Sequence, residues 1–194
     1  MATFKNPFKD GFKITSPYGP RTLNGEKQNH TGIDIVGLKT REVRSVIDGT
    51  VLVSRIITDK SNATWQWGNY VCVKGTDGKL IYYCHLASRR VAAGQKVKAG
   101  DVLGIMGNTG YSFGAHTHFE VREGSKPINA ADYLGIPNKT GNYVIPEISQ
   151  LEEDINVLVQ AGIINSPKYW ITHGNDVKYL PDLIHSMAES IRKN

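Results

Sequence analysis

The chain of 194 residues has only two cysteines, no long apolar run and no apolar leader. Two cysteines are too few for the disulfide framework that holds small secreted scaffolds together. No run approaches the roughly 20 apolar residues of a membrane-spanning helix, so we expect no membrane insertion. The first residues lack the apolar core of a signal peptide, so we expect synthesis in the cytoplasm.

Cys72 and Cys84 lie in two neighbouring apolar runs that are separated by a turn. They form no Cys-x-x-Cys pair and leave no thiolate set for a structural zinc site. Free thiols in the core are the favoured interpretation. A disulfide across the hairpin stays open, because it needs the two side chains in matching register on one face.

Charge is unevenly distributed along the sequence. Residues 1–145 contain 19 Lys and Arg against 11 Asp and Glu, a net charge of +8, whereas residues 146–194 carry 4 against 7, a net charge of −3. A basic first part favours an anionic partner, such as nucleic acid, a membrane surface or an acidic wall polymer. The basic residues are mostly scattered singly, which argues against a nucleic-acid groove.

The first part of the chain is rich in short β-type runs that end in glycine-containing turns. Lys74 to Lys79 contain Asp77-Gly78 and predict a hairpin. We expect strands near residues 48–53, 69–73, 80–84, 102–106 and 117–121. This pattern predicts a mainly β domain over residues 1–135, built as an antiparallel sheet or β-sandwich.

The sequence pattern changes after Gly135. Residues 136–145 are typical of a linker, and residues 146–194 predict a small helical segment. Pro146 suits the first turn of a helix and Gly162 its end. A short element near 166–170 and a helix with apolar residues from Val177 to Ile191 follow. Wall binding, docking on the first domain and self-association through this segment all stay open, as does the oligomeric state.

Four histidines in the first part stand in patterns that suit catalysis. On a strand, His116 and His118 share a face, so their imidazoles can converge on one small volume. His30 and Asp34 would lie about 13 Å apart on a straight strand, but Gly32 lets the backbone turn between them. Each pattern alone is weak, since strand histidines and a buried Asp–His pair explain them equally well.

Taken together, these residues favour a metal site. His30, Asp34 and one of His116 and His118 supply three nitrogen and oxygen ligands, the set typical of catalytic zinc with an open position. No acidic cluster suits calcium or magnesium. The remaining histidines are then candidates for moving a proton and stabilising a developing charge, as peptide hydrolysis requires.

Six sequence blocks in the right order resemble the lysostaphin-type, LytM-like zinc endopeptidases that cut bacterial peptidoglycan. The resemblance covers roughly residues 12–134. The blocks are Ser16-Pro17-Tyr18-Gly19-Pro20-Arg21, His30-Thr31-Gly32-Ile33-Asp34, Gly68-Asn69-Tyr70-Val71, Tyr83-Cys84-His85-Leu86, Gly94 to Gly104, and Gly107-Asn108-Thr109-Gly110 continuing to His116-Thr117-His118-Phe119-Glu120. The resemblance implies a lipoyl-like fold of the duplicated-hybrid-motif type.

Carried over residue by residue, the resemblance makes His30, Asp34 and His118 the ligands of one Zn²⁺. It makes His116 the residue that orients or deprotonates the attacking water, and His85 its partner at the water or the oxyanion. The departures, Thr117 and Cys84, remove no catalytic atom. The implied partner is bacterial peptidoglycan, reached after release from the cell in the manner of a phage lysin or as part of a phage tail.

Substrate contacts are less well indicated. Asn29, Asn69 and Tyr83 are candidates, although turn asparagines and half-buried strand aromatics explain them as well. Trp65 and Trp67 are expected in a loop beside the groove, with core packing and substrate contact both open. His173 and His185 are expected in surface or packing roles.

Two rival functions stay open. A β-sandwich of this kind could bind the wall, or activate an amidase, without cutting. The glycine-spaced stretch from Gly94 to Gly104 also suits a lipoyl, biotinyl or phosphohistidine carrier. Neither rival needs the full His and Asp set. The sequence leaves the scissile bond open between Gly–Gly bridges and links from D-Ala to a diamino acid.

Overall fold

The computed structural model describes residues 6–143, 150–167 and 180–192. The chain divides into two compact units, residues 1–145 and residues 146–194. Each unit is described by itself below. Within the described residues, no helix is both long enough and apolar enough to cross a membrane.

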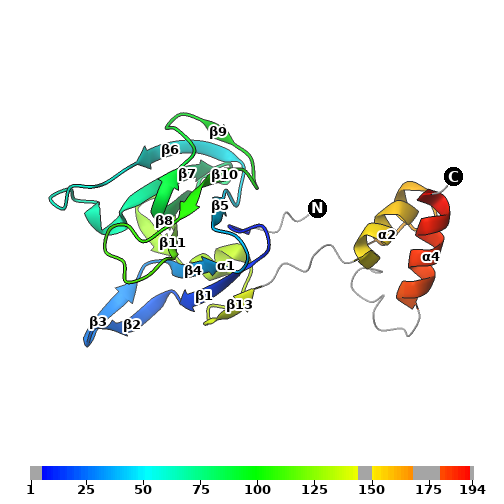
Figure 1. The fold of residues 1–194 in the computed structure, drawn as a ribbon, viewed down its shortest axis with the longest axis horizontal. Coiled ribbons are helices and arrows are strands. Elements are labelled where there is room, and N and C mark those ends of the chain that lie inside the picture. The colour runs from blue at the N-terminus through cyan, green and yellow to red at the C-terminus, as the bar shows by residue number, and fades with distance from the viewer. Residues whose placement is uncertain (1–5, 144–149, 168–179, 193–194) are drawn as a thin grey trace. The chain divides into compact units, whose positions relative to one another are not determined.

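The first unit is an antiparallel β structure, as the sequence predicted (Figure 1). Its strands are β1 Phe12–Ser16, β2 Gly19–Leu23, β3 Glu26–His30, β4 Ile33–Gly37, β5 Glu42–Arg44, β6 Gly49–Arg55, β7 Asn69–Gly75, β8 Leu80–Arg89, β9 Lys96–Val97, β10 Val102–Met106, β11 Thr117–Glu123, β12 Lys126–Ile128 and β13 Gly141–Tyr143. A single-turn 3-10 helix, Trp65–Trp67, precedes β7.

One sheet runs in the order β13-β1-β4-β11-β8-β7-β6-β9 across the described residues. Strand β10 bridges β8 and β5, and β12 pairs with β11. Strands β2 and β3 form a separate hairpin, which Figure 1 shows extending away from the sheet. The central position of β11, between β4 and β8, decides where the functional side chains meet.

The expected hairpin and strands are confirmed at β6, β7, β8, β10 and β11. Strands β7 and β8 pair antiparallel on either side of Asp77-Gly78. Gly78 has a φ of 81°, a left-handed conformation that favours glycine, and Asp77 Oδ1 accepts a hydrogen bond from the Lys79 amide at 3.1 Å. Local turn chemistry therefore sets this register.

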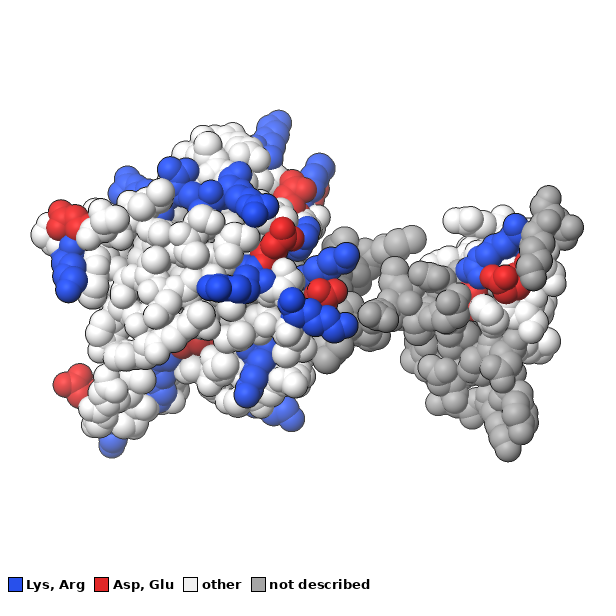
Figure 2. Space-filling view, in the orientation of Figure 1, with Lys and Arg blue, Asp and Glu red and all other residues white. Residues whose placement is uncertain are grey.

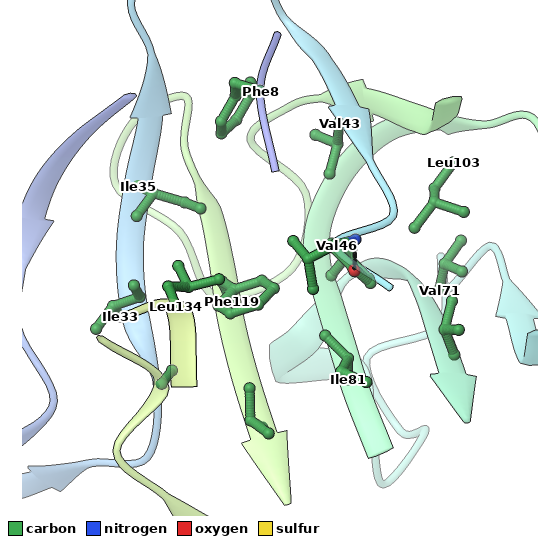
Figure 3. Packing of buried hydrophobic residues seen from close by; sticks show 14 of the residues in the cluster. Phe8, Ile33, Ile35, Val43, Val46, Val71, Ile81, Leu103, Phe119 and Leu134 are labelled. Atoms are coloured by element: carbon green, nitrogen blue, oxygen red, sulfur yellow. Dashed lines mark hydrogen bonds between the residues drawn. The ribbon is translucent and has the colours of Figure 1, made fainter. Parts of the chain in front are cut away.

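The core lies under the inward face of β11 and its neighbours. Phe119 and Val121 are fully buried on that face, and Figure 3 shows Phe119 between Leu134 and the strand that carries Ile81. Burying such a side chain contributes about 1.5–3 kcal/mol. Because strand side chains alternate, His118 and Glu120 take the opposite face.

The structure shortens the expected linker at 136–145. Residues Gly141–Tyr143 form β13 and pair with β1, and the Tyr143 ring lies 5.8 Å from the ring of Phe12. The Asn138 side chain also bonds both backbone groups of Tyr18, at 2.9 and 3.0 Å. The glycines and asparagines that suggested a linker instead shape a loop that returns to the sheet.

A short helix escaped the sequence reasoning. Helix α1, Ala130–Leu134, begins at Asn129, whose side chain accepts a hydrogen bond from the Ala131 amide. It ends at Gly135, which has a φ of 76°. Gly135, after which the sequence pattern changes, is thus the C-terminal cap of α1.

Both cysteines are free and buried, as predicted. Cys72 lies opposite Tyr82, and Cys84 lies opposite His118, so the two are not cross-strand partners. Burial raises the pKa of Cys72 to about 11 and raises that of Cys84 as well. Both thiols therefore stay protonated at neutral pH.

The described residues of the second unit include two packed helices, α2 Gln150–Gln160 and α4 Leu180–Arg192. Ile155, Leu158 and Ile184 form its buried centre. The carboxylate of Asp154 is fully buried and accepts hydrogen bonds from His185 Nδ1 at 2.8 Å and Arg192 Nη1 at 2.9 Å. His185 is 48% exposed and thus lies at the surface, paired with this carboxylate, whereas His173 and most of the element expected at 166–170 lie outside the described residues.

Shortening the chain tests the corrected boundary. A chain of residues 1–145 should unfold cooperatively, whereas a chain of residues 1–135 should have a lower melting temperature. The shorter chain loses the β13–β1 pairing and the packing of Tyr143, a loss of roughly 1.5–3 kcal/mol for one large side chain. Circular dichroism during heating measures both, and equal melting temperatures would show that 136–145 is a linker after all.

Candidate metal centre

Three side-chain atoms converge near the N-terminal end of β11. His30 Nε2, Asp34 Oδ1 and His118 Nδ1 lie 3.0 Å to 3.1 Å from one another. His30 and His118 are almost fully buried, and the Asp34 side chain is 14% exposed. Within the described part of the chain, these residues form a group that could hold a metal ion.

Strand pairing brings the three residues together. Strands β4 and β11 pair so that Asp34 lies directly opposite His118. His30 ends β3, and the chain bends at Thr31 and Gly32 before β4 begins. His30 and Asp34 therefore belong to different sheets, and the separation of a straight strand does not apply.

Glycine is required at position 32 because there is no room for a side chain, more than because the backbone needs an unusual conformation. A Cβ atom at this position would lie 2.4 Å from the Phe119 carbonyl oxygen and 2.9 Å from two ring atoms of His118. Only glycine allows the backbone to pass so close to the imidazole. The expectation that Gly32 lets the chain turn identified the right residue, but its close approach to His118 is the stronger reason.

Each of the three side chains has its other polar atom engaged elsewhere. His30 Nδ1 donates to the Pro17 carbonyl at 2.8 Å, and Arg21 Nη1 donates to Asp34 Oδ2 at 2.9 Å. His118 Nε2 bonds Glu120 Oε2 at 3.1 Å. These contacts fix the ring orientations and leave one lone pair of each ligand directed at the shared point, as outer partners do in metal sites.

The donor set fits zinc. Two imidazole nitrogens and one carboxylate oxygen are common zinc ligands, at bond lengths that place neighbouring ligand atoms about 3.3 Å apart in a tetrahedron. The separations of 3.0–3.1 Å here are close to that value. Three protein ligands also leave one position open, which distinguishes catalytic from structural zinc sites.

Electrostatics at the centre suit a cation. Burial opposes ionisation of Asp34, but hydrogen bonds from His118 and His30 outweigh it and hold the pKa of the carboxyl well below its usual range. Burial likewise opposes the charged form of His118, yet Asp34 and Glu120 raise its pKa to about 9. In the metal-free protein these charges compensate one another, and a bound metal ion would take the place of the His118 proton.

Two further imidazoles lie beside this group. The rings of His85 and His116 are 4.6 Å apart, and His116 Nε2 lies 3.6 Å from Asp34 Oδ1. His85 Nδ1 donates to the Thr109 carbonyl, and His116 Nδ1 donates to the Gly114 carbonyl, each at 2.8 Å. In both residues Nε2 therefore carries the free lone pair when the ring is neutral.

A bulge in β8 directs His85 toward the site. Asn69 pairs with Leu86 and Val71 with Tyr83, so β8 contains one extra residue there, and His85 takes a φ of 62°. Bulges of this kind redirect a side chain beside a functional site. Burial, with a smaller effect from His116, lowers the pKa of His85 to about 4, so its ring is neutral at pH 7.

Two hollows meet at the centre and share Arg21, His85, Tyr111 and His118. One, of about 330 Å³, is otherwise lined largely by Leu23, Val36, Phe113 and their neighbours. The other, of about 250 Å³, is lined by Gln28, Asn29, Gln66 and Trp67. The candidate metal ligands thus lie where an extended substrate crossing both hollows would pass.

The substrate candidates fare differently. Asn29 is exposed and lines the second hollow. Tyr83 is fully buried, and its hydroxyl accepts a hydrogen bond from the Val46 amide at 3.0 Å, so it cannot reach a substrate here. Asn69 is 7% exposed and its Oδ1 accepts from the Ile57 amide, which makes it a structural residue. Trp65 and Trp67 both pack against a side cluster that contains Ile57, and Trp67 also lines the second hollow.

Sequence reasoning gave no role to several residues that the structure places at the site. Arg21 and Glu120 belong to the quoted motifs, but their contacts to Asp34 and His118 are visible only in three dimensions. Tyr111 and Phe113 are 52% and 67% exposed, and their rings form an edge-to-face pair 5.1 Å apart at the first hollow. Exposed aromatic side chains in a glycine-rich loop were the available signal.

The family is defined by the comparison with known proteins. Residues 28–130 match the model described as Peptidase family M23, and the chain belongs to that family. Among curated relatives, the peptidoglycan DD-endopeptidase ShyA of Vibrio cholerae is 32% identical over 127 residues, 64% of this chain and 28% of that protein. The murein hydrolase activator NlpD of Escherichia coli is 34% identical over 113 residues, 58% of this chain and 28% of that protein.

Solved structures agree with this family. The catalytic domain of lysostaphin from Staphylococcus simulans has a TM-score of 0.55 and 27% identity over 64% of this chain and 92% of that one. A zinc-containing peptidase from Vibrio cholerae has a TM-score of 0.56 and 30% identity over 66% of this chain and 39% of that one. The chain spans about a third of the length of the curated relatives that it matches.

Substitution of the three predicted ligands tests the centre. His30→Ala, Asp34→Ala and His118→Ala should each lose bound zinc, because two ligands hold the ion poorly, whereas Asp34→Asn should weaken binding by removing charge. His185→Ala removes a histidine from the other unit and should keep full zinc content. Elemental analysis after dialysis measures the ratio of zinc to protein, and full retention by the three alanine variants would refute the assignment.

Proposed function

We propose that the chain is a zinc-dependent endopeptidase that hydrolyses peptide bonds in bacterial peptidoglycan. The observation that carries the proposal is the convergence of His30, Asp34 and His118, with the imidazoles of His85 and His116 beside them. The similarity to a peptidoglycan endopeptidase and to a zinc-containing peptidase supports the substrate and the metal.

His30, Asp34 and His118 would hold the ion through Nε2, Oδ1 and Nδ1. A bound zinc ion supplies Lewis acidity, which polarises a carbonyl and lowers the pKa of water to about 7. Pro17, Arg21 and Glu120 keep the ligand atoms oriented throughout the reaction. The two remaining histidines, His85 and His116, would then act on the attacking water.

His116 is the proposed general base. With Nδ1 donating to the Gly114 carbonyl, the free lone pair at Nε2 lies near Asp34, where the attacking water must approach the ligands. His116 Nε2 accepts the proton of that water and passes it to the leaving amine. A positioned base of this kind contributes about 10²–10⁴-fold to the rate.

His85 has a more restricted role than the sequence suggested. Its Nδ1 hydrogen is committed to the Thr109 carbonyl, so the neutral ring can accept but not donate at Nε2. Its low pKa of about 4 keeps it neutral. We therefore assign His85 to accepting a hydrogen bond from the attacking water, whereas a contact to the oxyanion would require a protonated ring.

A second function remains in view because of the similarity to a murein hydrolase activator. An activator would bind the wall or a partner hydrolase without cutting a peptide bond itself. The complete set of ligands and the two oriented histidines favour catalysis. A purified chain that stimulates an amidase but releases no peptide would favour the activator.

Digestion of purified peptidoglycan tests the proposal. The zinc-loaded chain should release new amino groups from peptidoglycan, chelation should abolish the release, and zinc should restore it. His116→Ala and His85→Ala should keep their zinc yet lose activity, about 10²–10⁴-fold for the base. His185→Ala should remain active.

Mass spectrometry of the released muropeptides would identify the bond that is cut. No new amino groups from any wall type, with zinc bound, would contradict the proposed reaction. If His116→Ala loses its zinc while His118→Ala keeps it, the roles of these two residues are exchanged.

A further inference from the structure

Arg122 lies between two aromatic rings on the outward face of β11. Its guanidinium carbon is 5.3 Å from the centre of the Trp67 ring and 5.0 Å from that of Tyr82. Both distances fall within the roughly 6 Å range of cation–π attraction. Trp67 and Tyr82 also contact each other, with ring centres 5.2 Å apart, so the three side chains form one cluster.

The same guanidinium holds a buried carboxylate. Arg122 Nε donates to Glu120 Oε1, and Glu120 is only 1% exposed. The other oxygen, Oε2, accepts from the hydroxyl of Thr31 and bonds His118 Nε2 at 3.1 Å. The carboxylate is thus held at both ends and cannot rotate without breaking one of these bonds.

The strand explains why these residues act together. Because side chains alternate along β11, His118, Glu120 and Arg122 share its outward face, while Thr117, Phe119 and Val121 face the core. Each member of the outward series bonds the next. One strand therefore supplies the predicted metal ligand His118, Glu120, which bonds His118, and Arg122, which bonds Glu120.

We propose that Arg122, held by Trp67 and Tyr82, is a positioning residue that fixes His118 for metal binding through Glu120. The inference rests on the proposed zinc site, but not on the reaction or its substrate. Arginine is suited to this place, because it donates in the plane of the guanidinium while its flat faces stack on the rings. Lysine lacks this planar group.

Zinc affinity is the measurement that tests this role. Arg122→Met should bind zinc more weakly, by up to the roughly 10–100-fold that removal of the direct outer partner Glu120 would cost, because Glu120 is then held at one end only. Arg122→Lys keeps the charge but should recover only part of the affinity. Competition with a chelator of known affinity gives the dissociation constants, and the visible spectrum of bound Co²⁺ should change in both variants.

Lys79→Met is the matched control. Lys79 lies next to β8 and its Nζ is 3.1 Å from a carboxylate oxygen of the exposed Glu123 on β11, so this variant also removes one positive charge and one ion pair. Its zinc affinity should be unchanged. An affinity loss in Lys79→Met equal to that in Arg122→Met would show a general charge effect and overturn the proposal.

A double variant tests whether Arg122 acts through Glu120. The double variant with Glu120→Ala and Arg122→Met should bind zinc about as weakly as Glu120→Ala alone, because the second change then removes nothing that reaches His118. Losses that multiply would overturn the proposal. If Arg122→Met fails to fold, Arg122→Lys carries the same test.

The failure of this inference is distinguishable from that of the proposed function. If the unaltered chain binds no zinc, the metal centre itself is wrong. If the unaltered chain binds zinc and Arg122→Met binds it equally well with an unchanged melting temperature, only the role of Arg122 is refuted.

Discussion

The antiparallel pairing of β4 with β11 sets Asp34 directly opposite His118, and the arrangement of the site depends on that register. A slip of one residue would move every side chain of β11 to the other face and exchange His118 and Glu120 for Thr117 and Phe119. The register is held by burial, since Phe119 and Val121 are fully buried in the core on the inward face. Figure 3 shows Phe119 among its core neighbours. The apolar residues on the inward face of β11 therefore determine where the polar residues on its opposite face lie.

The ligands are held by a second layer of bonds that also compensates charge. Asp34 and Glu120 place two carboxylates in a largely buried region, and each is paired with a guanidinium, Arg21 and Arg122 respectively. Removing one partner of such a pair leaves an uncompensated buried charge, which is more costly than never having the pair. Basic side chains elsewhere are spread over the visible face of the first unit and outnumber the acidic ones among them (Figure 2). That excess favours an anionic polymer as the partner, in keeping with the proposed wall substrate.

Short β-type runs ended by glycine turns allowed the sequence to predict the β class, and Asp77-Gly78 the β7–β8 hairpin. The period of two along a strand predicted a shared face for His116 and His118. The convergence of His30 with Asp34 could not follow from spacing, because the chain changes sheets between them. The bulge that directs His85 depends on pairing with β7, a long-range contact without a local signal. For Tyr83 and Asn69 the sequence left substrate contact and a structural role open, since strand position alone does not reveal which face is covered, and both residues are buried. Residues 136–145 were predicted to be a linker because a loop that returns to a sheet has the same composition as a linker between domains, whereas Gly141–Tyr143 pair with β1.

Diffraction data collected at the zinc absorption edge, from crystals grown with zinc, test the central claim most directly. The account predicts one anomalous peak within bonding distance of His30 Nε2, Asp34 Oδ1 and His118 Nδ1, with His85 and His116 near it but not bonded to it. A peak bonded to His116 in place of His118, or no peak at this position with saturating zinc, would contradict it.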